Sequence, residues 1–159
     1  MVRTATLKIG VPALLVCMAL NGYLAVDHLR QMRKMDALTL KSSKTQATIS
    51  GVLAALTDME TSQRGYLLTG DQSYLQPYTT TRDRIGSDFA NLRTQLAGRP
   101  QDEQSMESQL ESLAKLKQAE MDRTIDLRQR GYRHRSFMLV NTNEGKDYMD
   151  EVRRVGTSL

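Results

Sequence analysis

The chain has 159 residues, a length that suits one folded domain with a sizeable core and leaves little room for a second. Aromatic residues make up only 5% and Trp is absent, so the apolar mass comes from Leu, Ala and Met, which favours an aliphatic, all-α core over a β-sandwich. The net charge is +4, but once Arg3 and Lys8 are set aside the remaining 20 basic and 18 acidic side chains nearly balance. The chain also has no recognisable nucleic-acid-binding motif, so the sequence argues against a nucleic-acid partner.

The first apolar segment covers residues 9–26, IGVPALLVCMALNGYLAV, and carries no charge. At about 1.5 Å per residue it nearly spans a hydrocarbon core of about 30 Å, so we predict a transmembrane helix here, after a short cytoplasmic N-terminus at residues 1–8. A cleaved signal peptide is the alternative, because a basic stretch precedes the segment and Cys17 with Ala19 would form a small-residue cleavage pair. Segment length and flanks favour the anchor. Cys17 is the only cysteine, so no disulfide forms within the chain.

The direction of this span stays open when only charges are counted. More Lys and Arg residues follow the segment than precede it, which by the positive-inside rule would place the C-terminal part inside. Long domains, however, translocate largely regardless of charge.

A helix is predicted from about Asp27 to Thr69. Its apolar residues recur at spacings of three and four, as on one buried face: Ile49, Val52, Leu53, Leu56, Met59, Tyr66 and Leu67. Gly70 is a natural C-cap residue, and Asp71 can accept backbone N–H bonds at the start of the next helix. Residues 69–71 therefore predict a tight turn between two helices.

The second predicted helix ends at Gly98, and Pro77 is expected to loosen its first turns. Its apolar residues are typical of an antiparallel bundle seam: Tyr74, Leu75, Tyr78, Ile85, Phe89, Leu92 and Leu96. Pro100 opens the third helix, where its missing N–H costs little.

The third helix is expected to bury Met106, Leu110, Leu113, Leu116, Met121, Ile125 and Leu127. Two ends are possible: a break at Gly131, or continuation to the turn-like residues 141–145. The fourth helix begins near Lys146, and only about 14 residues, roughly 21 Å, remain for it, against roughly 39 Å for the second. The sequence thus predicts an up-down helical bundle whose fourth helix is cut short.

The stretch Glu60–Tyr78, ETSQRGYLLTGDQSYLQPY, resembles the signature of CHASE3 sensor domains. The matching positions are Glu60, Gln63, Arg64, Gly65, Leu67, Leu68, Gly70, Asp71, Tyr74, Leu75, Pro77 and Tyr78. A second stretch, GKDYMDEVRR at Gly145–Arg154, resembles the start of the family's last helix. We therefore expect residues 27–159 to form a CHASE3-like helical sensor domain that is incomplete at its C-terminus.

The resemblance implies a sensor outside the bacterial inner membrane, a single span in this chain, and a homodimer that passes a helix displacement across the membrane. The stimulus, a small molecule or a protein, is not specified by the sequence. Receptors of this type continue into a second span and an output module such as a histidine kinase, so the chain is expected to be the front part of a receptor. The alternative is a stand-alone anchored or secreted helical interaction protein that pairs with helices of a partner.

The candidate sensing and structural residues all lie in the matched signature: Glu60, Arg64, Gly65, Gly70, Asp71, Tyr74 and Tyr78. Glu60 and Arg64 are four residues apart, which predicts either local ion-pair support of the helix or a contact of Arg64 inside the bundle. Gly65 to Gly70 spells GxxxxG, but Asp71 stands where a phosphate-binding Lys is needed and would repel phosphate.

No constellation for catalysis, a metal or a cofactor is readable, so an enzyme is not expected. A basic cluster surrounds Gly131, and it either forms a solvated face paired with Asp122 and Asp126 or meets an anionic ligand: Arg128, Arg130, Arg133, His134 and Arg135. Tyr66, Tyr74 and Tyr78 are expected to gather at one end of the bundle, as core residues or as the lining of a small cavity.

Overall fold

The computed structural model describes the backbone of residues 2–159 and the side chains of Met18, residues 20–33, 35–36 and 39–159. This described part is helical throughout and contains no strand. Its elements are α1 (Val2–Thr69), the 3-10 helix η1 (Gln72–Tyr74), α2 (Leu75–Leu96), α3 (Gln101–Gln129), α4 (Arg133–Val140) and α5 (Glu144–Ser158). The chain divides into two compact units, Met1–Ser42 and Ser43–Leu159, and residues of α1 belong to both.

The first unit consists of the N-terminal part of α1. Its described large apolar side chains are exposed, between 47% at Val26 and 72% at Leu40. Within the described residues, no helix combines the length and the apolar character needed to cross a membrane. Most side chains of the span predicted at residues 9–26, namely those of residues 9–17 and Ala19, lie outside the described residues.

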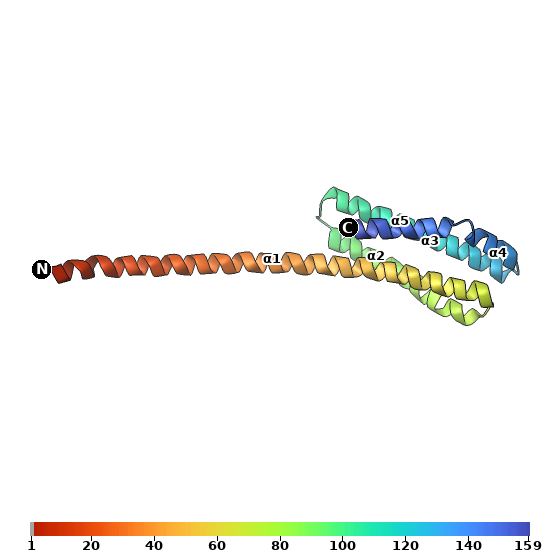
Figure 1. Cartoon of the computed structure of the whole chain (residues 1–159), viewed down its shortest axis with the longest axis horizontal. Coiled ribbons are helices and arrows are strands. Elements are labelled where there is room, and N and C mark those ends of the chain that lie inside the picture. The colour runs from red at the N-terminus through yellow and green to blue at the C-terminus, as the bar shows by residue number, and fades with distance from the viewer. Residues whose placement is uncertain (1) are drawn as a thin grey trace. The chain divides into compact units, whose positions relative to one another are not determined.

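The second unit is a bundle built from the rest of α1 together with α2, α3 and α5, with α4 as a short extra helix. Successive long helices run in opposite directions, as Figure 1 shows for the yellow end of α1, then α2, α3 and α5. The prediction of an all-helical bundle is therefore confirmed for this unit.

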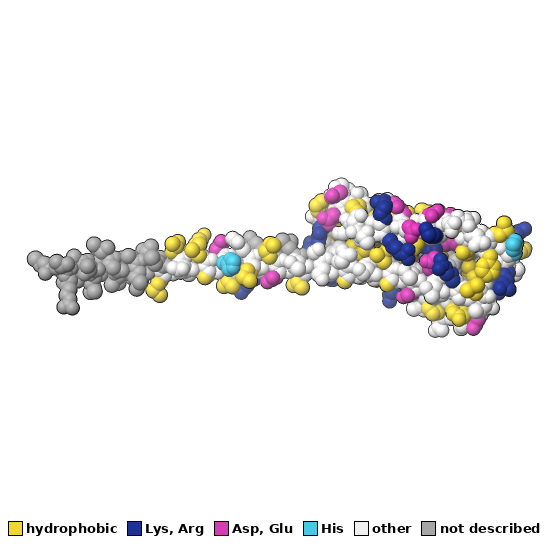
Figure 2. All heavy atoms as spheres, in the orientation of Figure 1, with side chains coloured by type: hydrophobic (Ala, Val, Ile, Leu, Met, Phe, Trp, Pro, Cys, Tyr) yellow, Lys and Arg dark blue, Asp and Glu magenta, His cyan; other side chains and the backbone are white. Residues whose placement is uncertain are grey.

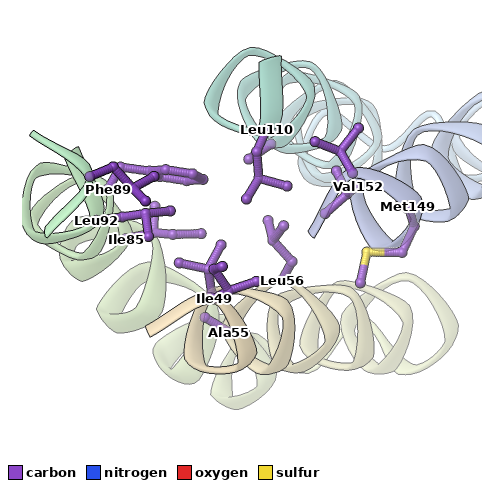
Figure 3. Close-up of a cluster of buried hydrophobic side chains, with 13 residues drawn as sticks. Ile49, Ala55, Leu56, Ile85, Phe89, Leu92, Leu110, Met149 and Val152 are labelled. Carbon is purple, nitrogen blue, oxygen red and sulfur yellow. The ribbon is translucent and has the colours of Figure 1, made fainter. Parts of the chain in front are cut away.

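The core lies where one face of each long helix meets the others. In Figure 3 the labelled side chains of Ile49 and Leu56 from α1, and those of the remaining helices, point toward one another: Ile85, Phe89 and Leu92 from α2, Leu110 from α3, and Met149 and Val152 from α5. A second cluster lies toward the turn after α1 and contains Met59, Tyr66, Leu67, Tyr78, Met121 and Ile125. Burial of these aliphatic faces is the main stabilising term of such a bundle.

The buried residues of α1 and α3 alternate at spacings of four and three, which keeps one face of each helix turned inward. In α1 this series is Thr45, Ile49, Val52, Leu56, Met59, Gln63 and Tyr66, and in α3 it is Glu107, Leu110, Ala114, Lys117, Met121 and Thr124. The prediction for α1 is confirmed in its apolar part. For α3 it is wrong at Leu116, which is 47% exposed, because the buried series passes through Ala114 and Lys117 instead.

The turns follow the predicted signals. α1 ends at Thr69, Gly70 has φ +77°, and the Asp71 carboxylate accepts a hydrogen bond from Ser73 N at 2.9 Å. That bond, which stabilises the ionised form, lowers the pKa of Asp71. The capped element is the 3-10 turn η1, which the sequence did not predict.

Of the two possible ends of the third helix, the structure has the earlier. α3 stops at Gln129, and Gly131 adopts φ +86°, a conformation that other residues reach only with strain. The short helix α4 then leads through Asn143, at φ 64°, into α5. α5 has 15 residues where α3 has 29, as the sequence predicted for a short last helix.

Candidate functional site: a polar layer inside the bundle

A layer of polar side chains interrupts the apolar core between α1 and α3. We call Glu60, Gln63, Lys117, Glu120 and Thr124 the polar layer. Four of these residues are at least nine-tenths buried: Gln63, Lys117 and Glu120 at 2% exposure and Thr124 at 0%. Buried charged groups are costly unless they are paired and hydrogen-bonded, so their partners decide what the layer can do.

Lys117 joins two helices through its ammonium group. Its Nζ donates to Glu120 Oε2 at 3.1 Å within α3 and to Glu60 Oε1 at 3.4 Å across to α1. Glu60 also accepts from Arg64 Nη2 at 2.8 Å. A cation shared by two carboxylates in a site of low dielectric fixes the position of α1 against α3 at this level.

A second polar contact crosses between the same helices, about one turn further along α1 and two turns further along α3. Gln63 Nε2 donates to Thr124 Oγ1 at 2.6 Å, and Thr124 Oγ1 donates to the carbonyl oxygen of Met121 at 2.8 Å. Because the Thr124 hydroxyl proton is used on Met121, its oxygen is free to accept from the Gln63 amide. The bond from Thr124 to Met121 thus determines that Gln63 is the donor in its bond with Thr124.

The start of α5 lies directly over the Lys117–Glu120 pair. A Cβ added to Gly145 would come within 2.7 Å of Lys117 Nζ and closer still to Glu120 Oε2. Gly145 is itself buried, in the first turn of α5. Only a residue without a side chain lets α5 approach the ion pair this closely.

A cavity of about 160 Å³ opens beside the polar layer, where α1, α3 and the turn between α4 and α5 meet. Its buried or partly buried lining includes Glu60, Gln63, Lys117 and Glu120, and its exposed rim carries Arg64, Asn141, Asn143 and Lys146. Figure 2 shows basic and acidic side chains close together over the bundle, next to a hydrophobic area. This is a partly enclosed polar site of the size of a small metabolite or a few water molecules.

The structure places two of the predicted site residues at this cavity. The Glu60–Arg64 pair is present at 2.8 Å, with Glu60 at 13% and Arg64 at 61% side-chain exposure. The hypothesis that Arg64 lies inside the bundle is therefore wrong, because its long side chain leaves the core and only Glu60 reaches Lys117. Arg64 supports the helix locally and lines the rim.

The other five predicted residues lie in or beside the turn after α1, with Gly65 in the last turns of α1 and Tyr78 at the start of α2. A Cβ on Gly65 would fall against the Tyr74 ring, 2.7 Å from its Cε1, and one on Gly70 would lie 2.7 Å from Arg128 Nη2. Tyr78 is buried and donates from its hydroxyl to Asp122 Oδ1 at 2.8 Å. Burial raises the pKa of Tyr78, and the bond to the Asp122 carboxylate raises it further.

The three tyrosines expected to gather at one end of the bundle do not share one environment. Tyr66 and Tyr78 belong to the core cluster near the turn, whereas Tyr74 is 43% exposed. They do not line the cavity described above.

The basic cluster around Gly131 is mostly a solvated face. Arg130 pairs with Asp126 at 2.9 Å, and Arg133 and Arg135 lie over the rings of Phe137 and Tyr132. Asp122 pairs with Arg82 at 3.2 Å instead of with the cluster. Arg128 alone turns inward, toward the end of α1.

Sequence reasoning missed Lys117 and Glu120. The signal was present in the spacing: continuing the four-and-three series from Leu110 and Ala114 reaches Lys117 and then Met121. A lysine at such a position is ordinarily assigned to the surface, and only a carboxylate supplied by another helix makes its burial tolerable.

The described residues contain no group of three or more His, Cys, Asp or Glu side chains arranged to hold a metal ion. The polar layer can bind and orient a small polar group. It offers no nucleophile next to a general base.

Comparisons with known proteins concern the fold and the family of the chain. The bundle is similar to the crystal structure of the Rhodopseudomonas palustris histidine kinase HK9 sensor domain, with a TM-score of 0.67 and 24% sequence identity, over 74% of this chain and 91% of that one. This likeness shows the fold. No curated protein matches the chain. Residues 36–159, more than three quarters of the sequence, match the CHASE3 domain, and the chain belongs to this family of sensor domains.

Proposed function

We propose that the chain is the extracytoplasmic input portion of a bacterial signal-transduction receptor, held at the inner membrane by a helix over residues 9–26, with the domain from residue 27 outside. Its membership of the CHASE3 family supports a sensing role, and the similar solved domain belongs to a histidine kinase. The uncharged segment at residues 9–26 supports the anchor. Catalysis would then belong to an output module.

The observation that carries this proposal is the bond from Lys117 to Glu60. It ties α1, the helix that contains the predicted membrane segment, to α3 in the core of the bundle. Helix shifts in receptors amount to about 1–2 Å, and such a shift would lengthen a 3.4 Å contact beyond hydrogen-bonding range. The two arrangements are thus the one with the Lys117–Glu60 bond and the one in which the shift of α1 has broken it. A ligand that favours one of them by about 1–3 kcal/mol is enough to relay a signal.

Fusion reporters test the location. Alkaline phosphatase joined after Leu159 is expected to be active and a fluorescent protein at the same place dark, while phosphatase joined after Lys8 is expected to be inactive. The reverse pattern would overturn the orientation. Fractionation separates the anchor from a cleaved signal peptide, because an anchored chain stays with the membranes and a cleaved one is released by osmotic shock.

The relay is tested in a chimera in which the chain is joined after Leu159 to a second apolar helix and a histidine kinase module. Glu60→Gln, which weakens the link to Lys117 at constant size, is expected to change basal autophosphorylation. Asp58→Asn, an exposed carboxylate on the same helix, is the matched control and is expected to leave it unchanged. Equal output from both variants would reject the relay through Glu60.

A homodimer is part of this proposal. Cross-linking of the full chain in membranes is expected to give a band of twice the monomer mass. A monomer at every concentration would contradict it.

A second candidate is a helical interaction protein, and one surface feature favours it. An apolar hollow of about 220 Å³ is lined by Leu67, Leu68, Phe137 and Val140, and Leu68 is 62% exposed. A partner helix would bury such a surface. If residues 27–159 melt cooperatively only when about 25 further helical residues extend α5, the interaction protein is rejected, because it must fold as it stands.

A further inference from the structure

Three oxygen atoms on the inner wall of the cavity accept no hydrogen bond from the described part of the chain. Both bonds to Glu60 fall on Oε1, the single bond to Glu120 falls on Oε2, and Gln63 is bound through its nitrogen. This leaves Glu60 Oε2, Glu120 Oε1 and Gln63 Oε1. Gln63 and Glu120 are each only 2% exposed as whole residues, and polar groups in such positions are normally satisfied by a protein group, a water or a ligand.

The orientation of the Gln63 amide is fixed by chemistry. The Thr124 hydroxyl donates its hydrogen bond to the Met121 carbonyl oxygen, so Thr124 Oγ1 can only accept from Gln63. The NH2 group of Gln63 must therefore face Thr124. The remaining Gln63 oxygen is therefore a free acceptor on a residue that lines the cavity.

Two of these three oxygens belong to carboxylates, which attract a cationic group. Lys117 provides one positive charge between two carboxylates, and Arg64 reaches Glu60 from the exposed side, where solvent screens it. A primary ammonium group has three N–H donors and one positive charge, which fits three free acceptors, two of them on carboxylates. A metal ion finds too few carboxylate and imidazole ligands among the described residues of this site.

The rim has the opposite character. Arg64 and Lys146 are cationic and exposed, each with one carboxylate partner, Glu60 and Asp150 respectively, and Asn141 and Asn143 add amide donors. Asn143 stands at the N-cap of α5 but makes no side-chain capping bond there, so its amide is not used by the helix. Together these groups suit a carboxylate.

We infer that the cavity binds an α-amino acid, with the ammonium group held by Glu60, Gln63 and Glu120 and the carboxylate facing Arg64 and Lys146. The volume of about 160 Å³ equals about five water molecules, and it is well below the roughly 300–1,000 Å³ of pockets for drug-sized ligands. This inference names the stimulus for the sensor proposed above, and its role in signalling rests on that proposal.

The test uses the purified full chain in lipid nanodiscs. Each common amino acid is added alone at about 5 mM and the melting temperature is recorded, since a ligand of the folded state raises it. For the amino acid with the largest shift, the N-acetyl derivative lacks the ammonium charge and the amide derivative lacks the carboxylate. Titration calorimetry is expected to show binding of the parent compound and at least about tenfold weaker binding of both derivatives.

Variants locate the site. Glu120→Gln and Glu60→Gln are each expected to weaken binding about tenfold or more, since each removes a carboxylate at constant size. If Glu120→Gln does not fold, the binding affinity of Glu60→Gln decides the test. Glu107→Gln is the matched control, another buried glutamate on α3 that lies outside this cavity, and is expected to bind normally.

The results that would contradict the ammonium site differ from the result that would contradict the role of the rim. No shift with any amino acid, equal binding of the N-acetyl derivative, or equal loss with Glu107→Gln would each overturn the ammonium site. Equal binding of the amide derivative would overturn the role of the rim. The fusion reporters and the kinase chimera do not depend on any of these binding results. The proposed sensor function is therefore tested independently of the amino-acid site.

Discussion

The side chain of Arg128 donates a hydrogen bond from Nε to the carbonyl oxygen of Leu67, 3.1 Å away, in the last turn of α1. Carbonyl groups in the last turn of a helix have no partner within it, and a cation there also meets the negative end of the helix dipole. Arg128 thus links α3 to the C-terminus of α1, next to the turn at Gly70.

Arg128→Ala is expected to destabilise the bundle by about 1.5–3 kcal/mol, because a charged hydrogen bond to a helix end is lost. Arg130→Ala removes the exposed pair with Asp126 and should change stability by less than about 1 kcal/mol. Urea unfolding followed by circular dichroism measures both. Equal values would show that the Leu67 contact adds nothing to stability.

Gly65→Ala tests the close contact between α1 and Tyr74. The added methyl group would displace the Tyr74 ring, and we expect a loss of about 1–3 kcal/mol although Ala favours helices. Gly86→Ala, on α2 with open space around it, should gain up to about 1 kcal/mol. The double variant Gly65→Ala with Tyr74→Ala should recover much of the loss, and no recovery would contradict the packing.

Lys117→Met tests the buried ion pair. The substitution leaves the Glu120 carboxylate buried without a cation, and the expected cost is about 3–5 kcal/mol. Adding Glu120→Gln removes that stranded charge and should restore part of the stability. A double variant whose loss equals the sum of the two single losses would show that Lys117 and Glu120 do not interact.

Glu107→Gln is expected to stabilise the protein at neutral pH. Burial raises the pKa of Glu107 above its ordinary value of 4.5, and its Oε1 has no hydrogen-bond partner. A raised pKa in the folded state means that the neutral carboxyl is tolerated and the charged form is penalised, so stability falls as pH rises through the folded-state pKa.

The gain from Glu107→Gln should therefore be present at pH 7 and disappear below pH 4.5, where the native side chain is already neutral in both states. Urea unfolding of both proteins at several pH values measures it. A constant difference across that range would show that the Glu107 charge is not the cause.

The sequence predicted most of the fold because the relevant signals are local. Gly70, Gly98 and Gly131 all have positive φ and mark the ends of α1, α2 and α3, and the apolar spacing in α1 and α2 identifies their buried faces. The face of α3 was misjudged at Leu116, since its buried series includes charged and polar residues that pattern reading assigns to solvent.

The candidate site was predicted only in part. Glu60 was identified from the matched signature, whereas its partner Lys117 lies 57 positions further along, and only the packing of α3 against α1 brings them together. The closeness of Gly145 to Lys117 is likewise a tertiary property, because nothing in a short sequence window tells which buried pair a helix start will cover.

The polar layer also limits how the bundle can move. One helical turn measures about 5.4 Å, so sliding α1 by a turn against α3 would carry Glu60 and Gln63 away from Lys117 and Thr124 and set the apolar side chain of Leu56 or Met59 near the buried ammonium. Intermediate positions would leave all of these groups without partners. The polar layer therefore favours one register of α1 against α3 over a shift by a whole helical turn.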